Sequence, residues 1–215
     1  KSDVFADNIR ETPQGLRFTV TTNSLRFDAD LNVIGRHNIN DALAAISAAV
    51  YFGLSEREII EGLASFRNVG MRQNIYRKSG MTIIEDCYNA SPESVLAAMQ
   101  VLKGISTEGR RFLILGGMRE LGDYAQKGHF DCGREAAAAA DFLYVFGENA
   151  EYYIEGAKKA GMNTERIRRF ATKSELAKTL AQTALPGDVL LIKGSRAMKM
   201  EEVTEFLFGE IKNEV

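Results

Sequence analysis

Apolar and polar positions alternate with a period of two along residues 1–34, which predicts β-strands. The apolar spacing then becomes helical, and a first helix is predicted from residue 38 to an end at Gly53. An S-x-x-E capping box that begins at Ser55 predicts a second helix as far as residue 66. The first part of the chain is therefore expected to be a group of strands followed by two helices.

Short apolar runs alternate with helical patterns in the rest of the chain. Residues 73–86 predict a β-hairpin, and Ser91 followed by Pro92 predicts the start of the next helix. Further apolar runs, each followed by a helical pattern, lie at residues 111–115, 142–146, 167–170 and 188–193. Such alternation is typical of a parallel sheet covered by helices on both faces. We therefore expect an α/β fold: a Rossmann-like, mostly parallel sheet over residues 70–215, preceded by a piece of strands and two helices over residues 1–68.

The composition is that of a folded protein whose net charge does not favour binding to nucleic acid or to an anionic membrane. The 215 residues are 45% hydrophobic and 26% charged, with a formal net charge of −2. Neither nucleic acid nor membrane insertion is expected, because the chain is not basic and no apolar run approaches the ~20 residues of a membrane helix. The two cysteines and two histidines show no metal-ligand spacing, and so few cysteines fit a reducing cytoplasm.

Four predicted strands end in polar or glycine-rich turns, at residues 86–89, 116–122, 147–149 and 193–196. Ligands of open parallel sheets bind beyond the carboxyl ends of the strands, so these turns predict a ligand site. The dinucleotide fingerprint G-x-G-x-x-G is absent, and Asp123 stands where a phosphate-binding loop requires lysine. An ATP phosphate cradle is therefore not expected at this edge.

Several residues in and near these turns allow more than one interpretation. Asp86 could accept hydrogen bonds from two ribose hydroxyls, or it could pair with a neighbouring cation. Lys193 and Arg196 could bind a carboxylate together, or they could be solvated cations. His129, expected to begin a helix after a glycine, could act in the site or only cap and pack; Asn38 could be a helix N-cap.

Five motifs together resemble the Mur ligases of peptidoglycan synthesis. They are GRHNINDALAA (35–45), GMRQ (70–73), DCYNASPESVLAAM (86–99), LGGMRELGDYAQKGH (115–129) and KGSRAMKME (193–201). They follow the family's order, and they are most similar to the member that adds D-Ala-D-Ala. The resemblance implies that residues 1–68 end the central ATPase domain and that residues 70–215 form the C-terminal Rossmann-like domain. The family's phosphate loop and magnesium ligands would lie upstream.

The resemblance also implies two groups of site residues. Those expected near the nucleotide are His37, Asn38, Asp41, Arg72, Asp86 and Asn89. Those expected near the substrates are Ser94, Gly116, Gly117, Glu120, Leu121, His129, Lys193, Ser195 and Arg196. No catalytic residue and no metal ligand is expected within this chain. Asp41 stands where the family usually has asparagine, and a carboxylate can accept but cannot donate a hydrogen bond.

The activity implied by the resemblance is ADP-forming amide ligation. ATP with Mg²⁺, UDP-MurNAc-tripeptide and D-Ala-D-Ala are the expected cofactor and substrates, in a cytoplasmic monomer that closes about a hinge near residues 69–71. The chain alone is expected to be inactive. Two other functions stay open: a stand-alone nucleotide-binding regulatory module, and a Rossmann-like oxidoreductase, which the missing dinucleotide fingerprint disfavours.

Overall fold

The computed structural model describes residues 3–12, 14–68 and 70–209, and it divides into two compact units, Lys1–Asn68 and Val69–Val215. The predicted hinge at residues 69–71 includes residue 69, which lies outside the described residues. Within the described residues, no helix combines the length and the apolarity needed to cross a membrane.

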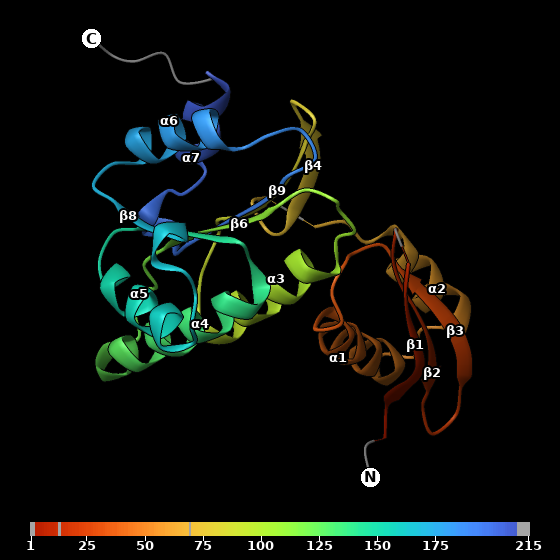
Figure 1. Cartoon of the computed structure of the whole chain (residues 1–215). Coiled ribbons are helices and arrows are strands. Elements are labelled where there is room, and N and C mark those ends of the chain that lie inside the picture. Colours follow the sequence, from red (N-terminus) through yellow and green to blue (C-terminus); the bar gives the residue numbers. More distant parts are fainter. Residues whose placement is uncertain (1–2, 13, 69, 210–215) are drawn as a thin grey trace. The chain divides into compact units, whose positions relative to one another are not determined.

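The first unit is an antiparallel sheet with two helices on one face (Figure 1). Its elements are β1 (Phe5–Thr12), β2 (Gly15–Thr21), β3 (Arg26–Leu31), α1 (Asn38–Tyr51) and α2 (Glu56–Ser65). Alternate strand residues such as Phe18 and Phe27 are buried against Ile46 and Leu63 of the helices. The opposite face of the sheet carries charged and hydroxyl side chains, including Arg17 paired with Asp30 at 2.7 Å. The period-two pattern therefore separates a core face from a polar face.

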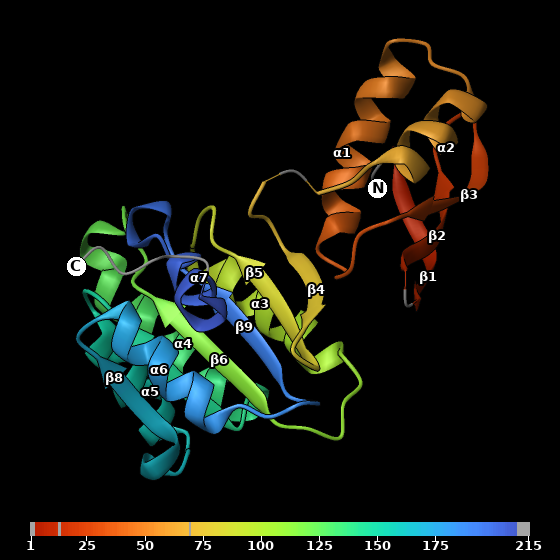
Figure 2. The same ribbon diagram turned by 90° about the horizontal axis from the view of Figure 1, so that it is seen from above.

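The second unit is a six-stranded sheet with the order β4-β5-β9-β6-β7-β8 (Figure 2). The strands are β4 (Asn74–Lys78), β5 (Met81–Asp86), β6 (Arg111–Gly116), β7 (Phe142–Phe146), β8 (Ile167–Phe170) and β9 (Val189–Lys193). The helices are α3 (Pro92–Gly104), α4 (Ala125–Ala139), α5 (Ala150–Lys159), α6 (Lys173–Thr183) and α7 (Glu202–Phe208). Only β4 is antiparallel to its neighbour, so the predicted α/β fold with a mostly parallel sheet is confirmed.

Helices cover both faces of this sheet, with α3, α4 and α5 on one side and α6 and α7 on the other (Figure 1). Phe112 and Leu190 belong to the apolar cluster that contains Leu176 and Leu180 of α6. The residues adjacent to them in sequence, such as Leu113, are equally buried. This explains why the strands are continuous apolar runs rather than alternating ones.

Two helices differ from the predictions. The helix expected to begin at His129 begins four residues earlier, at Ala125, after a 3₁₀ turn at Gly122–Tyr124. Gly128 therefore lies inside the helix, where a Cβ would come within 3.0 Å of Pro92. The last helix was predicted over residues 199–209 but is shorter, because Lys199 adopts a left-handed conformation with φ of 47° before α7 begins.

Candidate functional site at the carboxyl ends of the strands

The polar turns predicted from the sequence lie at one edge of the second unit's sheet. β5, β9, β6 and β7 are adjacent and mutually parallel, so the turns that follow them share their carboxyl edge (Figure 2). The register pairs Asp86 with Lys193, Lys193 with Leu115, and Gly116 with Phe146. Asp86 and Lys193, which are 107 residues apart in sequence, are thus neighbours here.

Asp86 and Lys193 form a short ion pair at the ends of β5 and β9. Lys193 Nζ lies 2.6 Å from Asp86 Oδ2 and donates a second hydrogen bond to the Asn89 carbonyl oxygen at 2.9 Å. The Lys193 side chain is 2% exposed and that of Asp86 is 18% exposed. Asp86 therefore does have the neighbouring cation considered as one of its two interpretations, and part of its side chain still faces solvent.

The turn after β5 is anchored to the segment that precedes β4. The amides of Cys87 and Tyr88 both donate to the Met71 carbonyl oxygen, at 2.9 and 3.2 Å. The guanidinium of Arg72 lies over the Tyr88 ring, 4.2 Å from its centroid. The side-chain oxygen of Asn89 accepts from the amide of the following residue at 2.8 Å. Arg72, Asp86 and Asn89, all predicted near the nucleotide, are thus brought together within this unit.

The glycine-rich turn after β6 is bound to the turn after β9. Ser195 N donates to the Gly117 carbonyl oxygen at 3.3 Å, and Arg119 N donates to Ser195 Oγ at 2.8 Å. Glycine is required at position 117 because a Cβ would lie 2.6 Å from the carbonyl oxygen of Glu148. Glu120 has a φ of +65°, a left-handed conformation that is uncommon for a residue with a side chain. The two turns therefore form one connected structure.

His129 is fully buried beneath the glycine-rich turn rather than exposed at the edge. Its Nε2 accepts from Met118 N at 2.9 Å, and its Nδ1 lies 2.7 Å from the Ala125 carbonyl oxygen. These partners require a neutral imidazole protonated on Nδ1. Burial lowers the pKa of His129, opposed by its bond to Ala125 and by the charge of Glu151. His129 thus holds the turn in place, which fits the packing alternative.

Lys193 and Arg196 do not form the joint carboxylate-binding pair considered in the sequence analysis. The Lys193 ammonium faces Asp86 and is buried, whereas Arg196 is half-exposed and pairs with Glu201. Arg196 also contacts the Met71 sulfur at 3.6 Å. The physical reason is the direction of the strand: Lys193 is its last residue and points into the sheet edge, while Arg196 belongs to the following 3₁₀ turn.

Three further predicted substrate residues, Ser94, Leu121 and Gly116, have local structural roles. Ser94 and Ser91 form a reciprocal cap at the start of α3, with the amide of Ser91 donating to Ser94 Oγ at 2.9 Å. Leu121 is half-buried and packs next to Gly128, where a Cβ would lie 3.3 Å from the leucine side chain. Gly116 is buried beside Met200. Glu120, another residue predicted near the substrates, is exposed at the carboxyl ends of the strands.

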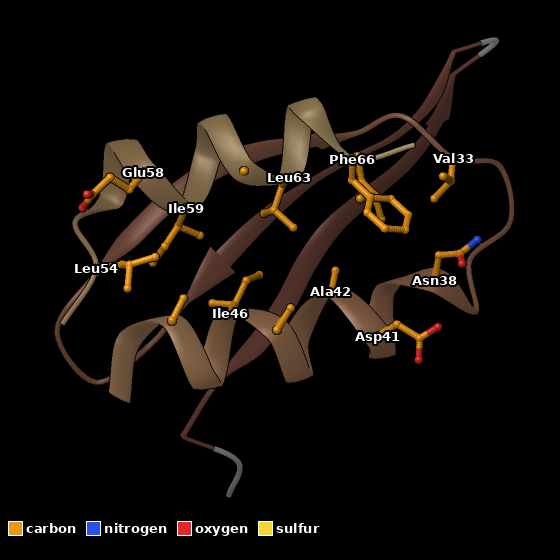
Figure 3. Close-up of a pocket in the computed structure, with 14 residues that line it drawn as sticks. Val33, Asn38, Asp41, Ala42, Ile46, Leu54, Glu58, Ile59, Leu63 and Phe66 are labelled. Carbon is orange, nitrogen blue, oxygen red and sulfur yellow. The ribbon is translucent and has the colours of Figure 1, made fainter. Parts of the chain in front are cut away.

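The other predicted nucleotide residues lie in the first unit, at the start of α1. His37 occupies the cap position, so the N-cap assignment of Asn38 is wrong: Asn38 is the first helical residue, and its side-chain amide donates back to the Ile34 carbonyl oxygen at 2.9 Å. Asn38 and Asp41 line one end of an apolar groove between α1 and α2, with a volume of about 280 Å³ (Figure 3).

Cys87 and Cys132 do not have the environment of a reactive thiol. Cys87 and Cys132 are buried, and burial raises the pKa of Cys132 to about 12 and that of Cys87 further. A nucleophilic thiol instead needs a lowered pKa and access. Across residues 3–12, 14–68 and 70–209, no three metal-binding side chains of His, Cys, Asp or Glu gather.

Sequence reasoning missed three residues that complete the site. Met71 supplies the backbone anchor, Gln73 N donates to Asp86 Oδ1 at 3.3 Å, and Glu201 holds Arg196. Glu201 Oε2 and Gln73 Nε2 are buried without a hydrogen-bond partner in the described part of the chain. Met71 and Gln73 lie in GMRQ and Glu201 ends KGSRAMKME, so the signal was present in motifs already singled out.

Comparison with known proteins matches this unit to a ligase family. The family described as Mur ligase, glutamate ligase domain, matches residues 71–196. The UDP-N-acetylmuramoyl-tripeptide–D-alanyl-D-alanine ligase of Bacillus subtilis strain 168 is 33% identical over 208 residues, which are 96% of this chain and 45% of that protein.

Solved structures of similar proteins cover both units. A crystal structure of MurF from Acinetobacter baumannii has a TM-score of 0.84 and 32% identity, and the match covers 97% of this chain and 46% of that one. MurF ligase from Thermotoga maritima in complex with ADP has a TM-score of 0.78 and 26% identity, over 98% of this chain and 47% of that one. The chain thus spans less than half the length of these relatives.

Proposed function

The chain belongs to the Mur ligase family, and from this membership we propose that it supplies the nucleotide-ribose and dipeptide sites of an ATP-dependent amide ligase. The ligase would add D-Ala-D-Ala to UDP-MurNAc-tripeptide in peptidoglycan synthesis, as the name of the Bacillus subtilis relative states for that protein. A monomer in the cytoplasm is part of the proposal. Residues 1–68 would be the end of the central ATPase domain, and residues 70–215 the C-terminal domain.

The proposed reaction proceeds in two balanced steps. The terminal carboxylate of the tripeptide takes the γ-phosphoryl group of ATP, and ADP leaves. The free amine of D-Ala-D-Ala then attacks the acyl phosphate, phosphate leaves with the bonding electrons, and the nitrogen loses a proton as the amide forms. Binding of phosphates and Mg²⁺ is assigned to residues outside this chain.

The observation that carries the proposal is the connected edge formed by the ends of β5, β9 and β6. Asp86 supplies a carboxylate on a partly exposed side chain there, and Ser195 and Arg119 connect the two turns assigned to the dipeptide. In this proposal the edge orients the dipeptide amine and excludes water from the acyl phosphate. Orientation of reacting groups can supply up to about 7–11 kcal/mol of a reaction barrier.

Asp86 is assigned to the ribose because a charged carboxylate is a strong hydrogen-bond acceptor for hydroxyls. His37, Asn38, Asp41, Arg72 and Asn89 are assigned to the remainder of the nucleotide. The ADP in the Thermotoga maritima relative supports a nucleotide site in proteins of this fold. Arg196, Glu120 and the glycine-rich turn are assigned to the dipeptide.

The direct test measures ADP release by the natural polypeptide that carries this chain. Release should require ATP, UDP-MurNAc-tripeptide and D-Ala-D-Ala together, and mass spectrometry should identify the ligated product. The 215-residue chain alone should release no ADP with the same substrates. Turnover by the chain alone would overturn its inactivity, and absence of ligation by the natural polypeptide would overturn the activity.

Replacement of Asp86 tests its assignment. Asp86→Ala should raise the KM for ATP by about 10- to 150-fold, because a hydrogen bond to a charged group contributes about 1.5–3 kcal/mol. Asp131→Ala is the matched control, since Asp131 is a carboxylate on α4 that forms an ion pair with Lys127. An unchanged ATP dependence in Asp86→Ala would remove Asp86 from the nucleotide site.

The two alternatives make different predictions in these assays. A regulatory module would bind nucleotide without forming a ligated product. An oxidoreductase would bind a nicotinamide cofactor and transfer hydride. Membership of a ligase family favours the proposed amide ligase over the regulatory module and the oxidoreductase.

A further inference from the structure

Lys193 is a buried lysine at the carboxyl ends of the strands, and it has no role in the proposed reaction described above. Its side chain is 2% exposed, and lysine is rarely buried to this degree unless it is paired. Replacing a buried ion pair by apolar residues is often neutral or stabilising, so a contribution to folding alone does not explain why a lysine lies here. The contacts of its ammonium group point to another role.

The ammonium group of Lys193 contacts both ends of the turn after β5. It donates to Asp86 Oδ2 at 2.6 Å at the start of the turn and to the Asn89 carbonyl oxygen at 2.9 Å at its end. The register places Asp86 directly opposite Lys193 on adjacent parallel strands. One buried donor thereby determines both the path of the turn and the orientation of the Asp86 carboxylate.

The remaining acceptor capacity of Asp86 fits a vicinal diol. A carboxylate offers about four acceptor positions on its two oxygens. Lys193 uses one position on Oδ2, and Gln73 N uses one on Oδ1 at 3.3 Å. One position on each oxygen is left, and 18% of the side chain is exposed. Two adjacent hydroxyls could therefore bind, one to each oxygen.

We infer that Lys193 is a positioning residue that holds Asp86 in the orientation needed to bind the two ribose hydroxyls of the nucleotide. This inference rests on the proposed function. It replaces the expectation that Lys193 contacts the dipeptide. β9 ends at Lys193, and the turn that follows it contains Ser195, which is hydrogen-bonded to the glycine-rich turn. The end of β9 therefore contacts both the turn assigned to the nucleotide and the turn assigned to the dipeptide.

The test is a double-mutant cycle on the KM for ATP, measured with the natural polypeptide that carries this chain. Lys193→Met should raise this KM about 10-fold, the cost of disturbing one charge-assisted hydrogen bond, and should change the KM for D-Ala-D-Ala much less. In the Asp86→Asn background the same replacement should change the KM for ATP less than about 2-fold, because the residues act as a unit. Equal effects in both backgrounds would overturn the inference.

Lys193→Met leaves Asp86 without its cation and could prevent folding, so Lys193→Arg provides a second test. Arginine keeps the charge but cannot place a single nitrogen between Asp86 and Asn89 in the same way. It should raise the KM for ATP by a larger factor than it changes kcat. An unchanged KM for ATP would overturn the inference.

A matched control breaks another ion pair at the opposite edge of the same sheet. Arg110 Nη2 lies 2.7 Å from Asp188 Oδ2, and these residues precede β6 and β9. Arg110→Met should lower the melting temperature without changing the KM for ATP. A rise in that KM equal to the rise in Lys193→Met would show a general effect of destabilisation and would overturn the inference. If the wild type shows no ATP-dependent ligation, the proposed function fails instead.

Discussion

The link between the two turns assigned to the dipeptide can be tested in the chain itself by replacing Ser195. Ser195 is 3% exposed, and its Oγ accepts the amide hydrogen of Arg119 at 2.8 Å. Ser195→Ala removes this acceptor and leaves the rest of the turn after β9 unchanged, including its amide bond to Gly117. The glycine-rich turn should then open more often around Arg119.

The expected magnitude follows from the position of the lost bond. Leaving a buried donor without a partner costs about 1–3 kcal/mol. The Arg119 residue is exposed at the edge, so water can replace part of the bond, and the lower half of that range applies. A cost of about 1–1.8 kcal/mol corresponds to an increase of about 5- to 20-fold in the population of the open turn.

The assay is amide hydrogen exchange of Arg119, which reports local opening. Exchange at this amide should accelerate about 5- to 20-fold in Ser195→Ala, with smaller changes in the strands. Ser47→Ala is the control, because the exposed Ser47 hydroxyl donates a hydrogen bond within α1, to the Leu43 carbonyl oxygen at 2.7 Å. Unchanged exchange at Arg119 would refute the claim that Ser195 holds the glycine-rich turn.

Three further predictions concern the buried groups of the second unit. Cys87 and Cys132 should resist thiol reagents until the chain unfolds, since burial raises the pKa of both; rapid labelling of the native chain would contradict this. Burial lowers the pKa of His129 in the folded chain. As the pH falls, the unfolded chain therefore takes up a proton at a higher pH than the folded chain does. The free energy of unfolding should be highest above about pH 6.5 and should decrease toward pH 5. Urea titrations should show a smaller decrease for His129→Gln, and equal decreases would exclude His129 as the cause. Gly133→Ala should lower the free energy of unfolding by about 1–3 kcal/mol, because its Cβ would lie 2.1 Å from a carbonyl oxygen of α5. Gly104 has open space around it, so Gly104→Ala should not lower the free energy of unfolding. Similar melting temperatures for the two variants would contradict the close packing of α4 on α5.

Local signals predicted most of the elements, because they depend on residues close together in sequence. The capping box at Ser55 and the Ser91-Pro92 start of α3 are present as predicted. The start of α4 was predicted wrongly because Gly128 suggested a break in the helix. A glycine lies inside this helix because Pro92 packs closely against position 128. Pro92 is 36 residues earlier in the chain, so this contact is not visible in a local pattern.

The sequence by itself determined the α/β pattern, the parallel strands and the set of motifs at their ends, since hydrophobic periodicity and turn chemistry are written locally. Only the tertiary structure decided which polar side chains meet. Asp86 and Lys193 become partners through strand register, His129 becomes buried through the packing of α4, and Arg196 is drawn to Glu201. The physical reason is that burial and hydrogen-bond partners are properties of neighbours in space, which the order of residues does not specify.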